Sequence, residues 1–81
     1  MSGGQALPPE AAESFSLAMA LAMRGDTQRA AMAALRAHEL APASAAAATL
    51  ASMVTLQLGR YREARRLALH AAALHVNPED L

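Results

Sequence analysis

Several residue types that stabilise sheets or covalent frameworks are missing or scarce in this chain of 81 residues. It has no cysteine, isoleucine or tryptophan, and only two valines, one phenylalanine and one tyrosine. Without cysteine no disulfide can form, so nothing in the sequence implies an oxidising compartment. Strands favour β-branched and aromatic side chains, whereas alanine, leucine, methionine, arginine and glutamate favour helices. The composition therefore argues against a sheet protein and predicts an all-α chain.

An excess of charge of one sign is also missing. Seven arginines balance seven acidic residues, and the chain has no lysine. The opening residues, MSGG, lack the basic and then apolar segments of a secretory signal. The longest stretch of low charge, residues 40–58, is interrupted by proline, serine, threonine and glutamine. It is too polar for a bilayer span of about 20 apolar residues. We therefore expect a soluble, cytoplasmic protein.

Alanine dominates the apolar residues that are present. It supplies 23 of the 44, and leucine supplies 12. Leaving out alanine and the large residues at the two ends, about 18 sizeable apolar side chains remain for a core. Burying one of them contributes roughly 1.5–3 kcal/mol, against roughly 1–2 kcal/mol for ordering each residue of backbone. A lone domain of this size is marginal, so we expect a second chain, either a copy or another protein.

Capping and helix-breaking residues divide the chain into four predicted helices. In chain order these residues are Pro8-Pro9-Glu10, Gly25-Asp26, Pro42, Ser44, Gly59 and Asn77-Pro78. They leave helices over residues 9–24, 27–40, 45–58 and from 60 or 61 to 75. Residues 1–8 are expected to be a flexible leader to a single helical domain over residues 9–78.

The sequence repeats itself with a period of 34 residues, the separation of Gly25 and Gly59. Residues 11–44 laid over residues 45–78 give nine identities, and the pattern G-x4-A-x3-A-L-x-A-x2-L occurs twice. The two glycines suit a tight reversal between antiparallel helices. Alanines at regular intervals after each glycine form a stripe of small side chains, which lets a neighbouring helix approach closely. Each unit is a helical hairpin that must stack on another to bury its apolar face.

With this period the chain resembles the tetratricopeptide repeat family, whose unit is a helix–turn–helix of about 34 residues. Residues 59–64, GRYREA, look like the family's turn motif. Small residues also fall where the family has them, and Pro42 matches its terminal proline; the small residues are Ala18, Ser52, Ala30, Ala64, Ala37 and Ala71. The departures are small residues in place of large ones, at Ala48, Ala51, Thr55, Ala34 and Ala68, and Val76 in place of a second proline.

The resemblance covers residues 11–78 and implies two hairpins in a right-handed stack. Repeat one would be residues 11–44 and repeat two residues 45–78. Two hairpins packed in some other way remain an alternative.

The residues that could carry catalysis or bind a metal are few. The three histidines are His38, His70 and His75, all in the last turns of predicted helices, where a histidine can hydrogen-bond the terminal carbonyls. His70 and His75 are five positions apart and do not share a helix face, and no carboxylate completes a metal set. We expect no metal, no cofactor and no enzymatic activity.

A basic patch, defined by Arg60, Arg62, Arg65 and Arg66, holds four of the seven positive charges. The preferred interpretation is a solvated face with a weak Glu63–Arg66 pair. An acidic partner protein is an alternative. Nucleic-acid binding is disfavoured, because the chain is neutral and has little aromatic area for stacking.

The resemblance also implies a partner-binding groove, lined by the first helix of each unit. Its members here are Phe15, Met19, Ala22 and Met23 in repeat one, and Thr49, Met53, Leu56 and Gln57 in repeat two, with Ala12 and Ala46 beside them. Methionine is flexible and repacks around varied apolar partners, so the expected ligand is an amphipathic helix. The alternative is that these methionines fill the core.

These features favour a protein-interaction module, namely a small chaperone or adaptor that holds an apolar helix of another protein. In size and class the chain is similar to the co-chaperones of bacterial type III secretion, which hold needle or translocator subunits. One alternative is a structural unit that associates with itself through the ends of its stack. Another is an RNA-binding or regulatory protein that uses the basic patch.

Overall fold

The computed structural model describes residues 7–75 and contains four helices in this part of the chain: α1 (Pro9–Met23), α2 (Thr27–Leu40), α3 (Ala45–Gln57) and α4 (Tyr61–His75). Each lies within one residue of the predicted bounds, and no strand occurs between residues 7 and 75. The all-α prediction is therefore confirmed. The expectations for residues 1–6 and 76–78, and for the side chain of His75, lie outside the described residues.

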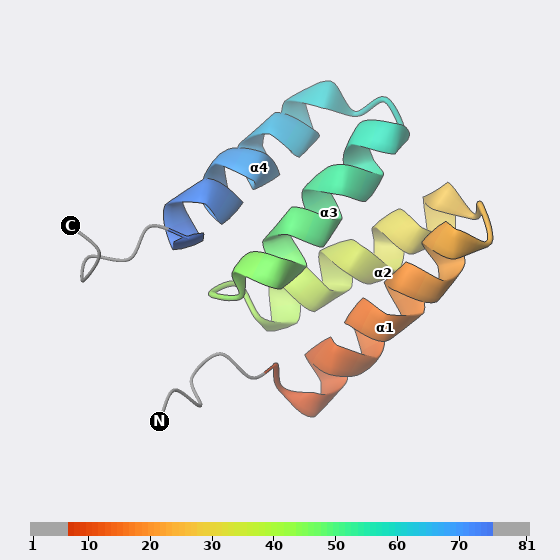
Figure 1. Ribbon diagram of the computed structural model, residues 1–81, viewed down its shortest axis with the longest axis horizontal. Helices are drawn as coiled ribbons and strands as arrows, with labels where there is room; N and C mark the ends of the chain where they lie inside the picture. Colours follow the sequence, from red (N-terminus) through yellow and green to blue (C-terminus); the bar gives the residue numbers. More distant parts are fainter. Residues whose placement is uncertain (1–6, 76–81) are drawn as a thin grey trace.

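The helices pack in chain order as two hairpins (Figure 1). Helix α1 packs on α2, α3 packs on α4, and α2 and α3 join the hairpins, while α1 meets α3 only slightly. The predicted caps form: the Asp26 carboxylate accepts from the Arg29 N–H at 3.3 Å, and the Ser44 hydroxyl accepts from the Ala47 N–H at 3.1 Å. These bonds satisfy N–H groups that have no partner inside the helix.

The two hairpin turns have the same backbone hydrogen bonds at equivalent positions of the repeat. The Gly25 N–H donates to the Ala22 carbonyl at 3.0 Å, and the Asp26 N–H donates to the Leu21 carbonyl at 2.9 Å. In the second hairpin, Gly59 bonds Leu56 at 2.9 Å and Arg60 bonds Thr55 at 3.0 Å. This pairing is the Schellman motif, and the two glycines adopt the left-handed φ it requires, +83° and +85°. The period of the sequence is thus a period of the backbone.

The core consists almost entirely of alanine. Of the 14 buried hydrophobic residues between residues 7 and 75, 12 are alanines, and the other two are Val54 and Leu67. Alanines of α1 and α2 form one cluster with Ala51, Val54 and Leu67, which lie on α3 and α4. Among the large apolar side chains available for a core, only Val54 and Leu67 are buried in the described part of the chain, and Leu21, Leu35, Leu50 and Leu58 pack partly buried against the cluster. Small side chains let the backbones approach closely, and most of the large ones are left at least partly exposed.

Three of the departures from the family pattern help to make this close packing possible. Ala48, Ala51 and Thr55 are completely buried on α3, where larger side chains would hold α3 away from its neighbours. The Thr55 hydroxyl donates to the Ala51 carbonyl at 2.8 Å and lies 3.1 Å from the Ser52 carbonyl. The buried hydroxyl therefore has its hydrogen-bond partner.

Between residues 7 and 75 no helix has both the length and the apolar character needed to cross a membrane.

Candidate functional site

The predicted groove residues lie on two helices and share a regular spacing. Phe15, Met19, Ala22 and Met23 follow an i, i+4, i+7, i+8 pattern on α1. Thr49, Met53, Leu56 and Gln57 repeat that pattern on α3. This spacing puts the members of each set on one face of their helix.

None of these eight residues is buried. Met19, Met23, Met53, Leu56 and Gln57 are exposed, and Phe15, Ala22 and Thr49 are half-buried. The exposed fractions are 46% for Met19, 85% for Met23, 54% for Met53 and 53% for Leu56. The alternative in which these methionines fill the core is therefore wrong. Their side chains offer flexible apolar area on the outside of the molecule.

The four arginines of the basic patch are all exposed, and two of them, Arg65 and Arg66, line different hollows. Arg65 lines a hollow between α3 and α4 together with Met53 and Leu56. Arg66 lines a cleft between α2 and α4 on another side of the helix. Arg65 and Arg66 therefore belong to different surfaces of α4.

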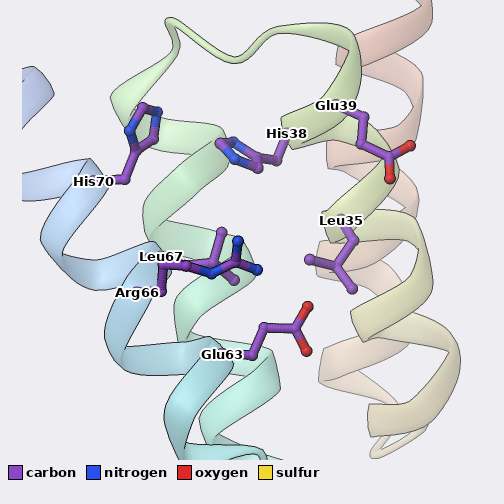
Figure 2. Close-up of a pocket in the computed structure, with 7 residues that line it drawn as sticks. All are labelled: Leu35, His38, Glu39, Glu63, Arg66, Leu67 and His70. Carbon is purple, nitrogen blue, oxygen red and sulfur yellow. The ribbon is translucent and has the colours of Figure 1, made fainter.

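The predicted Glu63–Arg66 pair is replaced by a different one. The Glu63 carboxylate lies 3.7 Å from the Arg60 guanidinium, and the only other ion pair between residues 7 and 75 joins Asp26 to Arg29. Figure 2 shows Arg66 and Glu63 both extending from α4 towards α2 without meeting. Each observed pair is at least partly exposed and spans i, i+3, so each contributes roughly 0.2–1 kcal/mol at most.

The cleft between α2 and α4 contains a group of titratable side chains that the sequence had not suggested as a site. It has a volume of about 500 Å³ and is lined by Leu35, His38, Glu39, Glu63, Arg66, Leu67 and His70 (Figure 2). The His38 and His70 rings meet edge to face, with their centroids 5.3 Å apart. His70 Nε2 lies 3.0 Å from the carbonyl oxygen of Pro42, in the turn after α2. His70 therefore contacts the other hairpin, and the expectation that it bonds the end of its own helix is wrong.

Burial makes His38 a weaker base than an ordinary histidine. Its Nδ1 is buried without a hydrogen-bond partner among the described residues. The pKa of His38 is lowered from 6.5 first by this burial and then by the neighbouring His70 and Arg66, while Glu39 acts in the opposite direction. His38 is therefore mainly neutral at pH 7.

The repeat could have revealed the histidine pair. The equivalent of His38 in the second hairpin is Ala72, and His70 lies only two positions before it. Both histidines therefore fall in the C-terminal halves of second helices that face each other across the stack. In the part of the chain that the structure describes, no three His, Cys, Asp or Glu side chains gather as a metal site would require.

Comparison of the chain with models of protein families, with curated proteins and with solved structures gave no match. The tetratricopeptide assignment thus remains a prediction, supported here by two turns with the same hydrogen bonds at equivalent positions of the repeat.

Proposed function

We propose that this chain is a protein-interaction module whose α1 and α3 surface holds an amphipathic helix of another protein, as a small chaperone or adaptor does. The observation that carries the proposal is the exposure of Met19, Met23, Met53 and Leu56 at regularly spaced positions of the two hairpins. We infer that these side chains form one apolar surface across the two hairpins, and exposed apolar patches are typical of binding sites.

The distribution of side chain sizes supports the same proposal. The hairpins pack on each other through alanine, while most methionines and several leucines point outwards. Four methionines, including Met32, are 46–85% exposed, more than a self-contained core would leave. Methionine side chains adjust their shape, so such a surface can accept helices whose apolar faces differ.

A helix is the ligand that suits this geometry. The residues of the partner-binding groove follow an i, i+4, i+7, i+8 spacing on α1 and again on α3. An amphipathic helix presents its own apolar side chains at similar intervals. The ligand helix would bury its apolar face against Met19 and Met53 and keep its polar face in water.

The test is co-purification from the cells that make the protein, with tagged wild type and the variants Met19→Glu and Met53→Glu. A charge at either position must be desolvated when a helix covers it, so we expect the bound protein to be lost. The matched control is Met32→Glu, an exposed methionine on α2 that lies outside the groove.

The proposal predicts one or more proteins retained by wild type and by Met32→Glu but absent from both groove variants. Retention by all four chains in equal amounts would contradict it. Circular dichroism of each variant checks that the helices are intact, since every substituted side chain is on the surface.

A further inference from the structure

The two ends of the stack each expose an apolar hollow. The first-hairpin end face has a hollow of about 410 Å³ lined by Leu17, Leu21, Arg29, Met32, Ala33 and Arg36. The second-hairpin end face has a hollow of about 210 Å³, whose lining includes Met53, Leu56, Tyr61, Ala64, Arg65 and Ala68. The terminal repeats of a stack normally have a polar outer face, whereas most of the residues that line these two hollows are apolar.

The sequence repeat shows which surface of the first hairpin is equivalent to the second-hairpin end face. The residues of the first repeat at positions equivalent to Ala64, Arg65 and Ala68 are Ala30, Ala31 and Ala34. Those three alanines are 0–2% exposed and belong to the cluster with Ala51 and Val54 of α3. The second-hairpin end face therefore corresponds to the surface on which α3 sits in the first hairpin.

The first-hairpin end face corresponds to the other side of the same contact. In the second repeat the positions equivalent to Leu17, Leu21 and Ala33 are occupied by Ala51, Thr55 and Leu67, which are all buried. The positions equivalent to Arg29, Met32 and Arg36 are occupied by Glu63, Arg66 and His70, which line the cleft between α2 and α4. The two end faces are thus the two halves of the interface that already joins the hairpins.

From this correspondence we propose that copies of the chain stack head to tail, with the first-hairpin end face of one copy on the second-hairpin end face of the next. The proposal does not depend on the helix-binding function, although Met53 and Leu56 belong to both surfaces. Because the two end faces differ, the contact is heterologous, and a pair of copies still has one free face of each kind to which further copies can add.

The equivalence of the two faces to the internal interface, together with their exposed apolar area, favours a second copy as the occupant. Leu17, Met32 and Tyr61 are 54%, 68% and 69% exposed in the single chain and would be covered in the stack. Arginines line both faces, Arg29 and Arg36 on the first and Arg65 on the second, so apolar burial and not charge attraction has to hold the copies together.

The experiment measures the mass of the purified full chain by sedimentation equilibrium, between about 1 µM and about 1 mM, where weak and moderate associations are resolved. Leu17→Arg blocks only the first-hairpin end face, and Ala68→Arg blocks only the second-hairpin end face. Both positions are exposed, so the fold should accept arginine, and Ala43→Arg in the exposed α2–α3 turn is the control of equal charge. Neither Leu17 nor Ala68 belongs to the proposed helix-binding groove.

We expect the mass of wild type and of Ala43→Arg to rise beyond that of a dimer with concentration. Each face variant alone should need at least about tenfold more protein to associate, because it buries an unpaired charge. An equimolar mixture of the two variants retains one intact pair of faces and should form dimers that contain one of each. Wild type that stays monomeric, growth that either face variant leaves unchanged, or a mixture that does not pair would overturn the proposal.

Discussion

The imidazole rings of His38 and His70 meet edge to face across the cleft between α2 and α4, with 5.3 Å between their centroids. This contact links the second helices of the two hairpins, which share no close backbone contact of their own. Protonation of His38 would place a charge beside His70 and Arg66 in a half-buried site, with Glu39 as the compensating carboxylate and Glu63 also lining the cleft.

The first prediction is that the folded state loses stability as the pH falls through the ordinary titration range of histidine. The pKa of His38 is lower in the folded chain than in the unfolded chain, so the unfolded chain binds the proton first. The contribution of His38 is fully present above the unfolded pKa of 6.5 and is lost as the pH falls towards the folded pKa. Urea unfolding between about pH 7.5 and about pH 5.5 measures the effect.

The control for this prediction is His38→Leu, which fills the site beside Leu35 and Leu67 without a titrating group. We expect this variant to show a weaker pH dependence of unfolding over the same range. An equal pH dependence in both chains would show that other groups are responsible.

The second prediction concerns the handedness of the turn at Gly59. Its φ is +85°, and a Cβ added there would meet no heavy atom within 4 Å. Gly59→Ala should therefore destabilise the fold by about 1–2 kcal/mol through backbone conformation alone. D-alanine, introduced by chemical synthesis, prefers this φ and should stabilise the fold by about 0.4–1 kcal/mol. Thermal unfolding of the two forms measures the difference, and equal effects of both alanines would be evidence against a left-handed turn.

The third prediction tests the alanine core. Ala51 is completely buried on α3, so Ala51→Leu should cost about 1–3 kcal/mol, because the extra atoms push the hairpins apart. Ala46→Leu makes the same change at an exposed position of that helix and should stay within about 0.5 kcal/mol of wild type. Urea unfolding of both variants gives the comparison. A core with room to spare would tolerate leucine equally at the two positions.

The fourth prediction uses the single tyrosine as a probe of head-to-tail stacking. Tyr61 is 69% exposed and lies on the second-hairpin end face. Its fluorescence should be quenched readily by acrylamide in dilute protein and less readily as copies stack over it. In Leu17→Arg the substitution lies on the first-hairpin end face, so it does not touch Tyr61 of the same copy. Tyr61 of this variant should stay readily quenched at high concentration, because no second copy covers it. Quenching that is independent of concentration in wild type would count against the stack.

Local rules predict the helices and their turns from this sequence. Gly25 and Gly59 end helices because glycine adopts the left-handed conformation cheaply, and Asp26 and Ser44 cap the helices that follow. These effects depend on neighbours within a few residues, so the pattern in the chain is sufficient. The internal repeat adds the correspondence of the two hairpins.

The direction in which side chains point depends on packing between hairpins and is harder to predict. Met19 and Met53 have the chemistry of core residues, yet alanines take the core positions, because close helix contacts leave no space for larger side chains. Glu63 has an arginine at i−3 and another at i+3, and its pairing with Arg60 rather than Arg66 is a choice that the spacing alone does not predict. His38 and His70 are distant in the sequence, and only the stack brings them together.

The measurement that tests the central claim most directly is a methyl NOE map of the dilute chain in solution. Two equivalent hairpins stacked through alanine predict helix breaks at Gly25 and Gly59. They also predict a network of NOEs joining the methyl groups of Ala30 and Ala34 to those of Val54 and Leu67. A helix that continues through either glycine, or methyl groups of the two hairpins that show no NOEs to each other, would contradict the account.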